Sequence, residues 1–484
     1  MNNPYKYSKT NKRYYTFDYY LKETYKSKVA KLPLDASFTC PNRDGKVGIG
    51  GCSFCNGVGS YGLENNQLSL VEQFDVAKQV MLHKWPNAKF IAYFQAFTNT
   101  YGSVEELKAI YEPFIKRDDV VALTIATRPD CLEQDILDYL ATLQARKPLY
   151  VELGLQTTFD KSAASFNRGY DYKVFLKAVN ELRKRGIFTV VHLINGLPNE
   201  TKNMQLTNVR RLAALDIQGI KIHSLNILKD TKLAKDYALK PFKIMNVDEY
   251  TSLVVQQLEL LREDIVVERI SADAKEEELI APTWSSKKTI VANEIDKKMA
   301  ALNTVQGAKY QKISEAVSFS HNLILNNSNF NVAIDATLGN GHDSEYLTAL
   351  FDEVYAFDIQ PLAIRRSQKL LQDIANITII QDSFINFTKY VHKKVDLVLY
   401  NLGFLPGTSH KIRTDAKTTI ESIKVAKTLL NNDGTIIIVA YTQHDNGAEY
   451  QALLEYLKTA PFTVQLHPNF EYERIIVLKP LPKL

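Results

Sequence analysis

Three cysteines near the start of the chain are the residues best suited to chemistry. Cys40, Cys52 and Cys55 are spaced C-x11-C-x2-C, and Cys131 is the fourth and last cysteine of the 484 residues. Three thiolates are too few for a four-thiolate iron–sulfur site, but they suit a cluster that leaves one iron open to a small ligand. A structural zinc site is the alternative, although zinc takes four ligands and the next histidine is His83.

A second group of chemical residues lies in the second half, where acids follow apolar segments. Residues 330–335 read as a strand that ends in an acid, and a small-residue loop follows, with the candidate ligand contacts Asp335, Gly339, Asn340, Gly341 and Asp343. The glycines allow close backbone approach to a ligand, and the helix start favours negative charge. The next two strand patterns end in residues that suit ribose and adenine, namely Asp358, Gln360, Asp382 and Ser383. A fourth strand pattern, 395–400, precedes Asn401, Leu402 and Gly403.

Both groups need strands to position them, and the first half of the chain alternates strand and helix patterns. Nearly continuous apolar runs at 90–95, 120–126, 149–157, 188–194 and 219–225 are separated by helical patterns such as 172–185. This alternation predicts a parallel sheet buried on both faces. Polar residues at the ends of the runs mark the rim where barrel-like folds carry their sites; they are Gln95, Asn99, Arg128, Asp130, Glu152 and Gln156. His192 and His223 either face the lumen or belong to the core.

Length and composition favour a globular chain of two or three domains. We place one boundary near residue 311, which gives the predicted domains 1–310 and 311–484. The N-terminus lacks the apolar run of a signal peptide, no stretch is apolar enough to span a bilayer, and the clustered cysteines favour a reducing cytoplasm. The net charge is only +5, but residues 5–31 are rich in lysine and tyrosine. This segment either contacts nucleic acid or forms a solvated helix whose tyrosines pack inward.

The cysteine loop resembles that of the radical S-adenosylmethionine (SAM) superfamily. Its long first gap is similar to the branch that contains the YhcC/YtqA-type and Elongator-type proteins, and the YhcC/YtqA family is further indicated by the motifs TRPDC, ELGLQT, HLINGLP, KIHSLNILK and IAPTWSSKK. The resemblance covers about residues 14–310 and implies a partial (β/α) barrel with a 4Fe–4S cluster on the three cysteines. It also implies SAM at the open iron, radical cleavage of SAM, and an external electron donor of the flavodoxin or ferredoxin type.

The same resemblance assigns the polar rim residues to SAM or substrate. Gln95 and Asn99 stand where a Gly-Gly-Glu motif usually holds the SAM amino group, and Arg128, Asp130, Glu152 and Gln156 are the further candidate contacts. Cys131 is either a packed thiol or a radical relay or hydrogen donor. Methylthiotransferases of this superfamily need three more thiolates for a second cluster, so their chemistry is excluded.

The second half resembles a Rossmann-like class I SAM-dependent methyltransferase, and more closely the YtqB-type family. The motifs that carry this likeness are DATLGNGHD, AFDIQ and NLGFLPG, within about residues 314–484. The loop of Asn401, Leu402 and Gly403 is similar to the Asn-Pro-Pro-Tyr loop of amino-methyltransferases, which implies that it orients an amine at the SAM methyl group. Asp343, His342, His444 or water would accept the amine proton, and the residues leave that choice open.

The two resemblances together imply a bifunctional enzyme of tRNA wobble-uridine modification, with an MnmL-like first half and an MnmM-like second half. The first half would convert 5-carboxymethylaminomethyl-(2-thio)uridine to the 5-aminomethyl form, and the second would methylate that amine. The partner would be the anticodon stem-loop of tRNA. Two alternatives remain: a two-site SAM enzyme acting on a small metabolite, and a non-catalytic cluster-bearing tRNA-binding protein. The oligomeric state is not indicated by the sequence.

Overall fold

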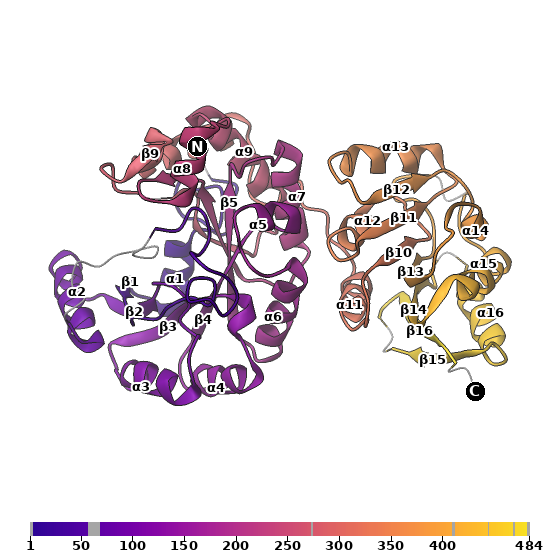
Figure 1. Ribbon diagram of the computed structural model, residues 1–484, viewed down its shortest axis with the longest axis horizontal. Coiled ribbons are helices and arrows are strands. Elements are labelled where there is room, and N and C mark those ends of the chain that lie inside the picture. The colour runs from indigo at the N-terminus through magenta and orange to yellow at the C-terminus, as the bar shows by residue number, and fades with distance from the viewer. Residues whose placement is uncertain are drawn as a thin grey trace. The chain divides into compact units, whose positions relative to one another are not determined.

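The chain folds into two compact units, Met1–Gln311 and Lys312–Leu484. The computed structural model describes residues 3–56, 68–272, 274–408, 412–443, 445–467 and 470–481, so the predicted catalytic residue His444 lies outside the described residues. Each unit has its own sheet (Figure 1). Among the described residues, no helix combines the length and apolar character needed to cross a membrane.

The first unit is built on an open, seven-stranded sheet in which all neighbours pair in parallel. The strands, in sheet order, are β1 (Val29–Leu34), β2 (Lys89–Phe94), β3 (Val120–Thr127), β4 (Leu149–Gln156), β5 (Phe188–Asn195), β6 (Gly219–Ser224) and β8 (Val266–Arg269). The five predicted apolar runs correspond to β2 to β6, whereas β1 and β8 were not predicted. The prediction of a partial (β/α) barrel is confirmed.

Helices connect these strands, and α3, α4, α6 and α7 lie along the outer side of the sheet (Figure 1). The helices of the first unit are α1 (Phe17–Tyr25), α2 (Leu70–Lys84), α3 (Val104–Ile115), α4 (Gln134–Gln144), α5 (Asp160–Ser165), α6 (Tyr172–Lys184), α7 (Lys202–Ala213), α8 (Lys232–Leu239), α9 (Val247–Leu260) and α10 (Lys288–Ala301). Capping boxes start α2, α3 and α9, where a Ser or Asn side chain and a Glu three residues later satisfy free backbone N–H groups. A short antiparallel pair, β7 (Ile227–Leu228) with β9 (Leu279–Ala281), lies beyond β6.

The lysine- and tyrosine-rich N-terminal segment packs on the protein. Tyr5 and Tyr14 are buried, and the hydroxyls of Tyr20 and Tyr25 contact the Tyr150 hydroxyl at 3.2 and 3.0 Å. Most of its lysines pair with acids, as in Lys6–Glu263, Lys9–Glu23, Lys12–Asp296, Lys22–Asp18 and Lys28–Asp18. Of the two interpretations offered above, the helix with inward-packed tyrosines is therefore the one that the structure supports.

The second unit is a mixed sheet with strand order β12-β11-β10-β13-β14-β16-β15. Its strands are β10 (Val332–Asp335), β11 (Glu353–Phe357), β12 (Ile377–Ile380), β13 (Val395–Asn401), β14 (Leu430–Tyr441), β15 (Phe462–Leu466) and β16 (Glu473–Pro480). Strands β10 to β14 pair in parallel and β16 runs antiparallel to both of its neighbours. The predicted Rossmann-like class I methyltransferase fold is confirmed.

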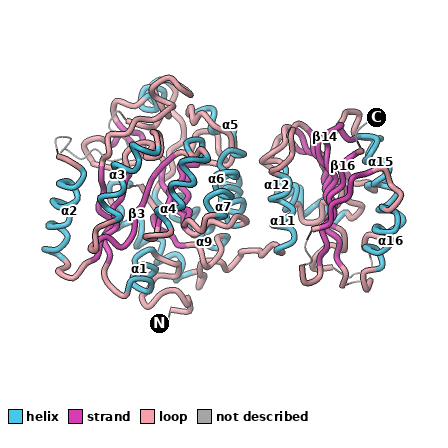
Figure 2. Tube along the Cα trace, turned by 90° about the horizontal axis from the view of Figure 1, so that it is seen from below, coloured by secondary structure: helices cyan, strands magenta, loops and turns pink. Residues whose placement is uncertain are grey.

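Helices cover both faces of this second sheet, with α11 and α12 on one side and α15 and α16 on the other (Figure 2). The helices are α11 (Glu315–Ile324), α12 (His342–Leu347), α13 (Pro361–Leu370), α14 (Phe387–Tyr390), α15 (Ala416–Leu429) and α16 (Ala448–Leu457). Strand side chains such as Val398, Tyr400 and Ile438 are fully buried between the layers. This burial on both faces explains why the strands read as continuous apolar runs.

Candidate functional site

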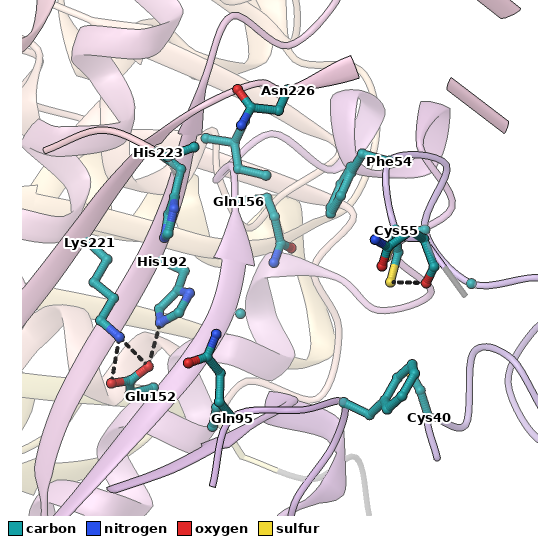
Figure 3. A pocket seen from close by; sticks show the side chains of 18 of the residues that line it. Cys40, Phe54, Cys55, Gln95, Glu152, Gln156, His192, Lys221, His223 and Asn226 are labelled. Atoms are coloured by element: carbon teal, nitrogen blue, oxygen red, sulfur yellow. Dashed lines mark hydrogen bonds and ion pairs between the residues drawn. The ribbon is translucent and has the colours of Figure 1, made fainter. Parts of the chain in front are cut away.

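A cavity of about 980 Å³ lies at the carboxyl ends of strands β2 to β6 in the first unit. Its lining includes the three clustered cysteines, together with Gln95 and Gln156. Figure 3 shows Cys40 and Cys55 on one side of the cavity, a group of charged side chains on the opposite side, and the two glutamines between them. The polar ends of the predicted strands therefore converge, as the parallel sheet requires.

The cysteine loop is shaped by backbone hydrogen bonds. The Gly51 N–H donates to the Asn42 carbonyl at 2.8 Å, and the Cys55 N–H donates to the Cys52 carbonyl at 2.9 Å. Two donors approach the sulfurs: Asn42 Nδ2 is 3.8 Å from Cys52 Sγ and an Arg43 guanidinium nitrogen is 3.9 Å from Cys55 Sγ. Burial raises the pKa of Cys52 to about 12 and also raises that of Cys55.

This donor set fits an iron–sulfur cluster better than it fits zinc. All three thiols are free and face one cavity, and N–H donors directed at cysteine sulfur are the environment that tunes such clusters. The part of the chain that the structure describes contains no preformed group of three or more His, Cys, Asp or Glu side chains able to hold a metal ion.

Glu152 is the centre of a buried hydrogen-bonded network on the opposite side of the cavity. Its carboxylate lies 2.6 and 2.7 Å from Lys221 Nζ, 2.8 Å from Lys31 Nζ and 2.9 Å from His192 Nε2. The Tyr93 hydroxyl donates to the same carboxylate at 2.8 Å. These donors occupy the carboxylate oxygens, so Glu152 organises the floor of the cavity that it lines; its predicted contact to SAM or substrate stays a prediction.

Burial sets the protonation of the network's cationic members. Burial lowers the pKa of Lys221 from 10.5 to about 8, although the charge of Glu152 opposes the shift. Burial also lowers the pKa of His192, and that of His223 falls well below its ordinary value for the same reason. His223 Nε2 is enclosed and has no hydrogen-bond partner among the described residues. Both imidazoles line the cavity, so the two histidines face the lumen and do not belong to the core.

The other predicted rim residues divide into two sets. Gln95, Arg128 and Gln156 line the cavity, but Asn99 and Asp130 are not among its lining residues. Asn99 is fully buried and its amide nitrogen donates to the Ala96 and Ala126 carbonyls, each at 2.9 Å, while its Oδ1 is enclosed and has no hydrogen-bond partner among the described residues. Asp130 binds the Arg128 guanidinium through both oxygens, at 2.9 and 2.7 Å. It orients Arg128 and does not itself face the cavity.

Sequence reasoning missed Lys31, Tyr93 and Lys221 as site residues. Lys31 was counted with the basic N-terminal surface, but it lies on β1 and bridges Glu152 and Glu268 at 2.8 and 2.7 Å. Lys221 is two residues before His223 on β6, so the two-residue period of a strand points both side chains to the same face. A lysine inside an otherwise apolar strand was the signal that could have found it.

In the second unit, Asp335 supports the loop that follows β10. One of its oxygens accepts from the Thr337 N–H at 3.0 Å, and the other accepts from Ser344 Oγ at 2.6 Å. Burial, and then the charge of Asp343, raises the pKa of Asp335 to about 7. Gly341 has φ +88°, and a Cβ there would lie 2.9 Å from Ser367 Oγ, so the loop requires glycine at this position.

The predicted ribose and adenine residues take different local roles. Asp358 accepts from the Gly339 N–H at 3.0 Å and the Gln360 N–H at 2.8 Å, and it stands at the end of β11 beside the loop. Asn340 accepts from Arg366 at 3.1 Å. The Asp382 carboxylate is occupied by nearby donors that hold its pKa well below its ordinary value, led by Asn386 and including Tyr390 and the Ser383 N–H.

Asn401 ends β13 and lies at one end of a chain of hydrogen-bonded side chains whose middle member is Asp343. Its Nδ2 donates to Asp343 at 3.0 Å, and the other oxygen of Asp343 lies 2.8 Å from His321 Nε2. The Leu402 side chain is buried in the core, and its N–H donates to the Val439 carbonyl at 2.8 Å. The Gly403 carbonyl accepts from the Thr414 N–H at 2.9 Å. His321 was not identified from the sequence, because it lies on a helix outside every recognised motif.

Comparison with known proteins places both units in families. Residues 40–209 match the Radical SAM superfamily, 217–301 match the Radical SAM C-terminal domain, and 354–467 match an rRNA methylase family. "tRNA (mnm(5)s(2)U34)-methyltransferase, chloroplastic" of Arabidopsis thaliana is 31% identical over 140 residues, which is 25% of this chain and 50% of that protein. The chain therefore spans about half the length of this plant methyltransferase.

Two relatives cover the first unit. "Uncharacterized protein YtqA" of Bacillus subtilis is 45% identical over 315 residues, which is 65% of this chain and 98% of that protein. "Protein YhcC" of Escherichia coli is 35% identical over 279 residues, or 57% of this chain and 89% of that protein. The predicted fusion of two SAM-dependent enzymes is confirmed. The chain belongs to the YtqA/YhcC family of radical SAM proteins, to which a class I methyltransferase unit is joined in the same polypeptide.

Proposed function

We propose that this enzyme carries out two consecutive modifications of the wobble uridine of tRNA in the cytoplasm. The first unit converts the 5-carboxymethylaminomethyl group of (2-thio)uridine to a 5-aminomethyl group: with SAM as the oxidant and water as co-reactant, the bond from nitrogen to the carboxymethyl carbon breaks and the two-carbon fragment leaves as an oxo acid. The second unit transfers a methyl group from SAM to that amine and forms 5-methylaminomethyl-(2-thio)uridine. The product of the first step is the acceptor of the second, so joining the two enzymes raises the local concentration of the intermediate.

The likeness of the second unit to a tRNA (mnm(5)s(2)U34)-methyltransferase is the observation that carries this proposal. That relative acts on the same nucleoside whose amine the first unit would expose. A radical SAM enzyme in the same chain then has a natural task, which is to supply an amine for methylation. Relatives named Elongator complex protein 3, 26% identical over 157 residues in the human form, are consistent with a radical SAM unit, but the methyltransferase likeness names the tRNA position.

In the first unit, Cys40, Cys52 and Cys55 are the residues that would hold the cluster. When bound, the cluster and SAM supply a strongly oxidising carbon radical that removes a hydrogen atom from the substrate. Gln95, Arg128 and Gln156 line the cavity and are proposed to bind SAM or substrate. Reduction of the cluster requires an external donor, for which a flavodoxin or ferredoxin is suited.

In the second unit, the loop between Asp335 and Asp343 is proposed to hold SAM. The backbone at Gly339 and Gly341 allows close approach, and Asp358 is placed to accept the ribose hydroxyls. Asn401 is the group proposed to position the amine. SAM is already activated by its sulfonium charge, so the main task of this chain is to orient a neutral amine and exclude water.

The proposal is tested with full-length protein reconstituted anaerobically with iron and sulfide. The protein is incubated with SAM, a reductant and tRNA that carries 5-carboxymethylaminomethyl-(2-thio)uridine, and nucleosides are then identified by mass spectrometry. We expect the 5-methylaminomethyl nucleoside, together with 5′-deoxyadenosine and S-adenosylhomocysteine. An unchanged wobble nucleoside with full cluster content would refute the tRNA assignment. Bound zinc without an oxygen-sensitive brown chromophore would refute the radical assignment.

Two single variants separate the steps. Cys52→Ala should stop the first conversion but still methylate tRNA that already carries the 5-aminomethyl group. Asn401→Ala should perform the first conversion and accumulate the 5-aminomethyl nucleoside. If Cys52→Ala also abolished methylation of the aminomethyl tRNA in well-folded protein, two independent sites in one chain would be the wrong description.

A further inference from the structure

Three polar side chains from separate elements form one hydrogen-bonded chain in the second unit. His321 comes from α11, Asp343 from α12 and Asn401 from the end of β13. From this chain we infer that His321 and Asp343 are positioning residues, which lock the Asn401 amide so that its oxygen accepts an N–H from a neutral primary amine. The inference rests on the proposed methyl transfer to an aminomethyl group and assigns Asp343 to the amine instead of to SAM.

The chain fixes which way the Asn401 amide points. A carboxylate only accepts hydrogen bonds, so the Asn401 atom 3.0 Å from Asp343 must be the NH₂ group. Flipping the amide would place two oxygens against each other at this distance. His321 Nε2–H holds the second carboxylate oxygen at 2.8 Å, so Asp343 cannot swing away from Asn401 without losing that bond. The orientation of the amide is therefore transmitted from α11.

The other end of the amide is left without a partner. Asn401 Oδ1 is enclosed and accepts no hydrogen bond within the described part of the chain; the Tyr441 hydroxyl lies beside the Asn401 side chain, which lowers the pKa of Tyr441 against the larger effect of burial. An enclosed acceptor left in this state has lost its hydrogen bonds to water without replacing them, so its retention calls for an explanation. A bound amine replaces one of these hydrogen bonds by donating one N–H to Oδ1. That contact leaves the nitrogen lone pair free for the methyl group, whereas an ammonium ion has no lone pair to offer.

Both ends of the chain are firmly placed. The backbone N–H of Asn401 donates to Thr337 Oγ1 at 2.7 Å, which holds the Asn401 backbone against the loop after Asp335. The His321 ring stacks on Tyr346 with centroids 3.9 Å apart and planes within 3° of parallel, and the Tyr346 hydroxyl donates to the His321 carbonyl at 2.9 Å. His321 is therefore held by two contacts that do not involve its Nε2.

The charged groups around Asp343 support an ionised carboxylate. Burial raises its pKa, but the hydrogen bond and charge of His321, the Asn401 amide and the charge of His342 lower it, and the net pKa lies below the ordinary value. Asp335 and the Tyr441 hydroxyl also face it, and both have raised pKa values because they are buried. An ionised Asp343 keeps Asn401 in the required orientation.

The two functions of His321 can be separated by a matched pair of variants in full-length protein. His321→Gln keeps an N–H donor of similar reach and loses the stacked ring. His321→Phe keeps the ring over Tyr346 and loses the donor. With tRNA that carries the 5-aminomethyl group, we expect kcat for methylation to fall about tenfold to a hundredfold in His321→Phe and by less than about threefold in His321→Gln. KM for SAM should stay unchanged in both.

Equal losses in the two variants, or a loss confined to KM for SAM, would overturn the inference while leaving wild-type methylation of tRNA intact. A second measurement needs no substrate. In NMR spectra of the full-length protein, the Asn401 side-chain NH₂ should be protected from solvent exchange in wild type and His321→Gln and should lose protection in His321→Phe. Wild-type protein that fails to methylate the tRNA refutes the proposed function, and the NMR comparison still decides whether His321 positions Asn401.

Discussion

Replacing Glu152 by glutamine tests the network on the cavity floor. The substitution keeps the size of the side chain and removes the negative charge shared by Lys31 and Lys221. Lys31 keeps a second carboxylate, Glu268, at 2.7 Å. Lys221 is 3.8 Å from Glu268 and loses its close anion. The variant therefore leaves one buried ammonium without adequate compensation.

The expected loss of stability follows from this count of partners. Breaking a buried ion pair by removing one partner costs about 3–5 kcal/mol, and we expect the lower end because Lys31 remains paired. At roughly 2 °C for each kcal/mol in a unit of this size, the first unit should melt about 6 °C lower. The penalty should shrink as the pH rises, because burial lowers the pKa of Lys221 to about 8 even with Glu152 present, the substitution lowers this pKa further, and deprotonation removes the unpaired charge.

Tryptophan fluorescence is a selective assay for this loss. The chain has two tryptophans, Trp85 and Trp284, and both belong to the first unit. Glu23→Gln is the matched control, because Glu23 makes only exposed pairs with Lys9 and Lys26 and should leave the midpoint unchanged. Adding Lys221→Met to Glu152→Gln removes the stranded ammonium and should restore part of the stability. The proposed charge balance would be wrong if Glu152→Gln and Glu23→Gln had the same melting midpoint. It would also be wrong if the double variant were less stable than Glu152→Gln alone.

Three further predictions concern single positions. Gly341→Ala should weaken SAM binding by the second unit at least about tenfold, measured by calorimetry, because its Cβ would lie 2.9 Å from Ser367 Oγ at a φ of +88°; unchanged affinity would contradict the close packing. Native Asp335 binds its proton more tightly than the unfolded chain, since its pKa is raised from 3.8 to about 7, so the second unit should lose stability as pH rises between these values. Unfolding of the second unit is followed by circular dichroism, because the two tryptophans report only the first unit. The decline of its stability with pH should vanish in Asp335→Asn. Cys131→Ala should keep the iron content of reconstituted protein, because this buried thiol does not line the cavity, and iron loss equal to that of Cys52→Ala would disprove its exclusion from the cluster.

The sequence predicts the architecture well because buried parallel strands leave a strong local signal. The runs that became β3 and β13 are almost wholly apolar and are bounded by polar loops, so their existence and end points follow from the residues alone. Strand β1 was not predicted because Lys31 and Pro33 interrupt its apolar pattern. Strand β8, with only four residues, is too short to show a period. These two edges of the first sheet become visible only through pairing with β2 and β6.

The candidate site was predicted less completely, because its partners are distant in sequence. Glu152 was singled out within the predicted run 149–157, but the two lysines that neutralise it lie 121 and 69 residues away. Asn99 was placed among ligand contacts because polar residues after strands tend to face a site; the two backbone carbonyls that its amide nitrogen contacts could not be foreseen from the sequence. The pairing of His321 with Asp343 spans two helices and has no spacing that a motif could reveal.

Glu152 and Asp335 show how two buried carboxylates acquire opposite properties. Two lysines and a histidine surround Glu152 and overcome the effect of burial, so its pKa lies well below the ordinary value. For Asp335, burial and the charges of the acids Asp343 and Asp358 act in the same direction, and its pKa rises to about 7. A cluster of acids around a glycine-containing loop favours a positively charged ligand, and SAM carries a sulfonium and an ammonium group. In the first unit the charge of Glu152 is already matched by Lys31 and Lys221, and the same cavity also presents the uncharged amides of Gln95 and Gln156 and the Arg128 guanidinium.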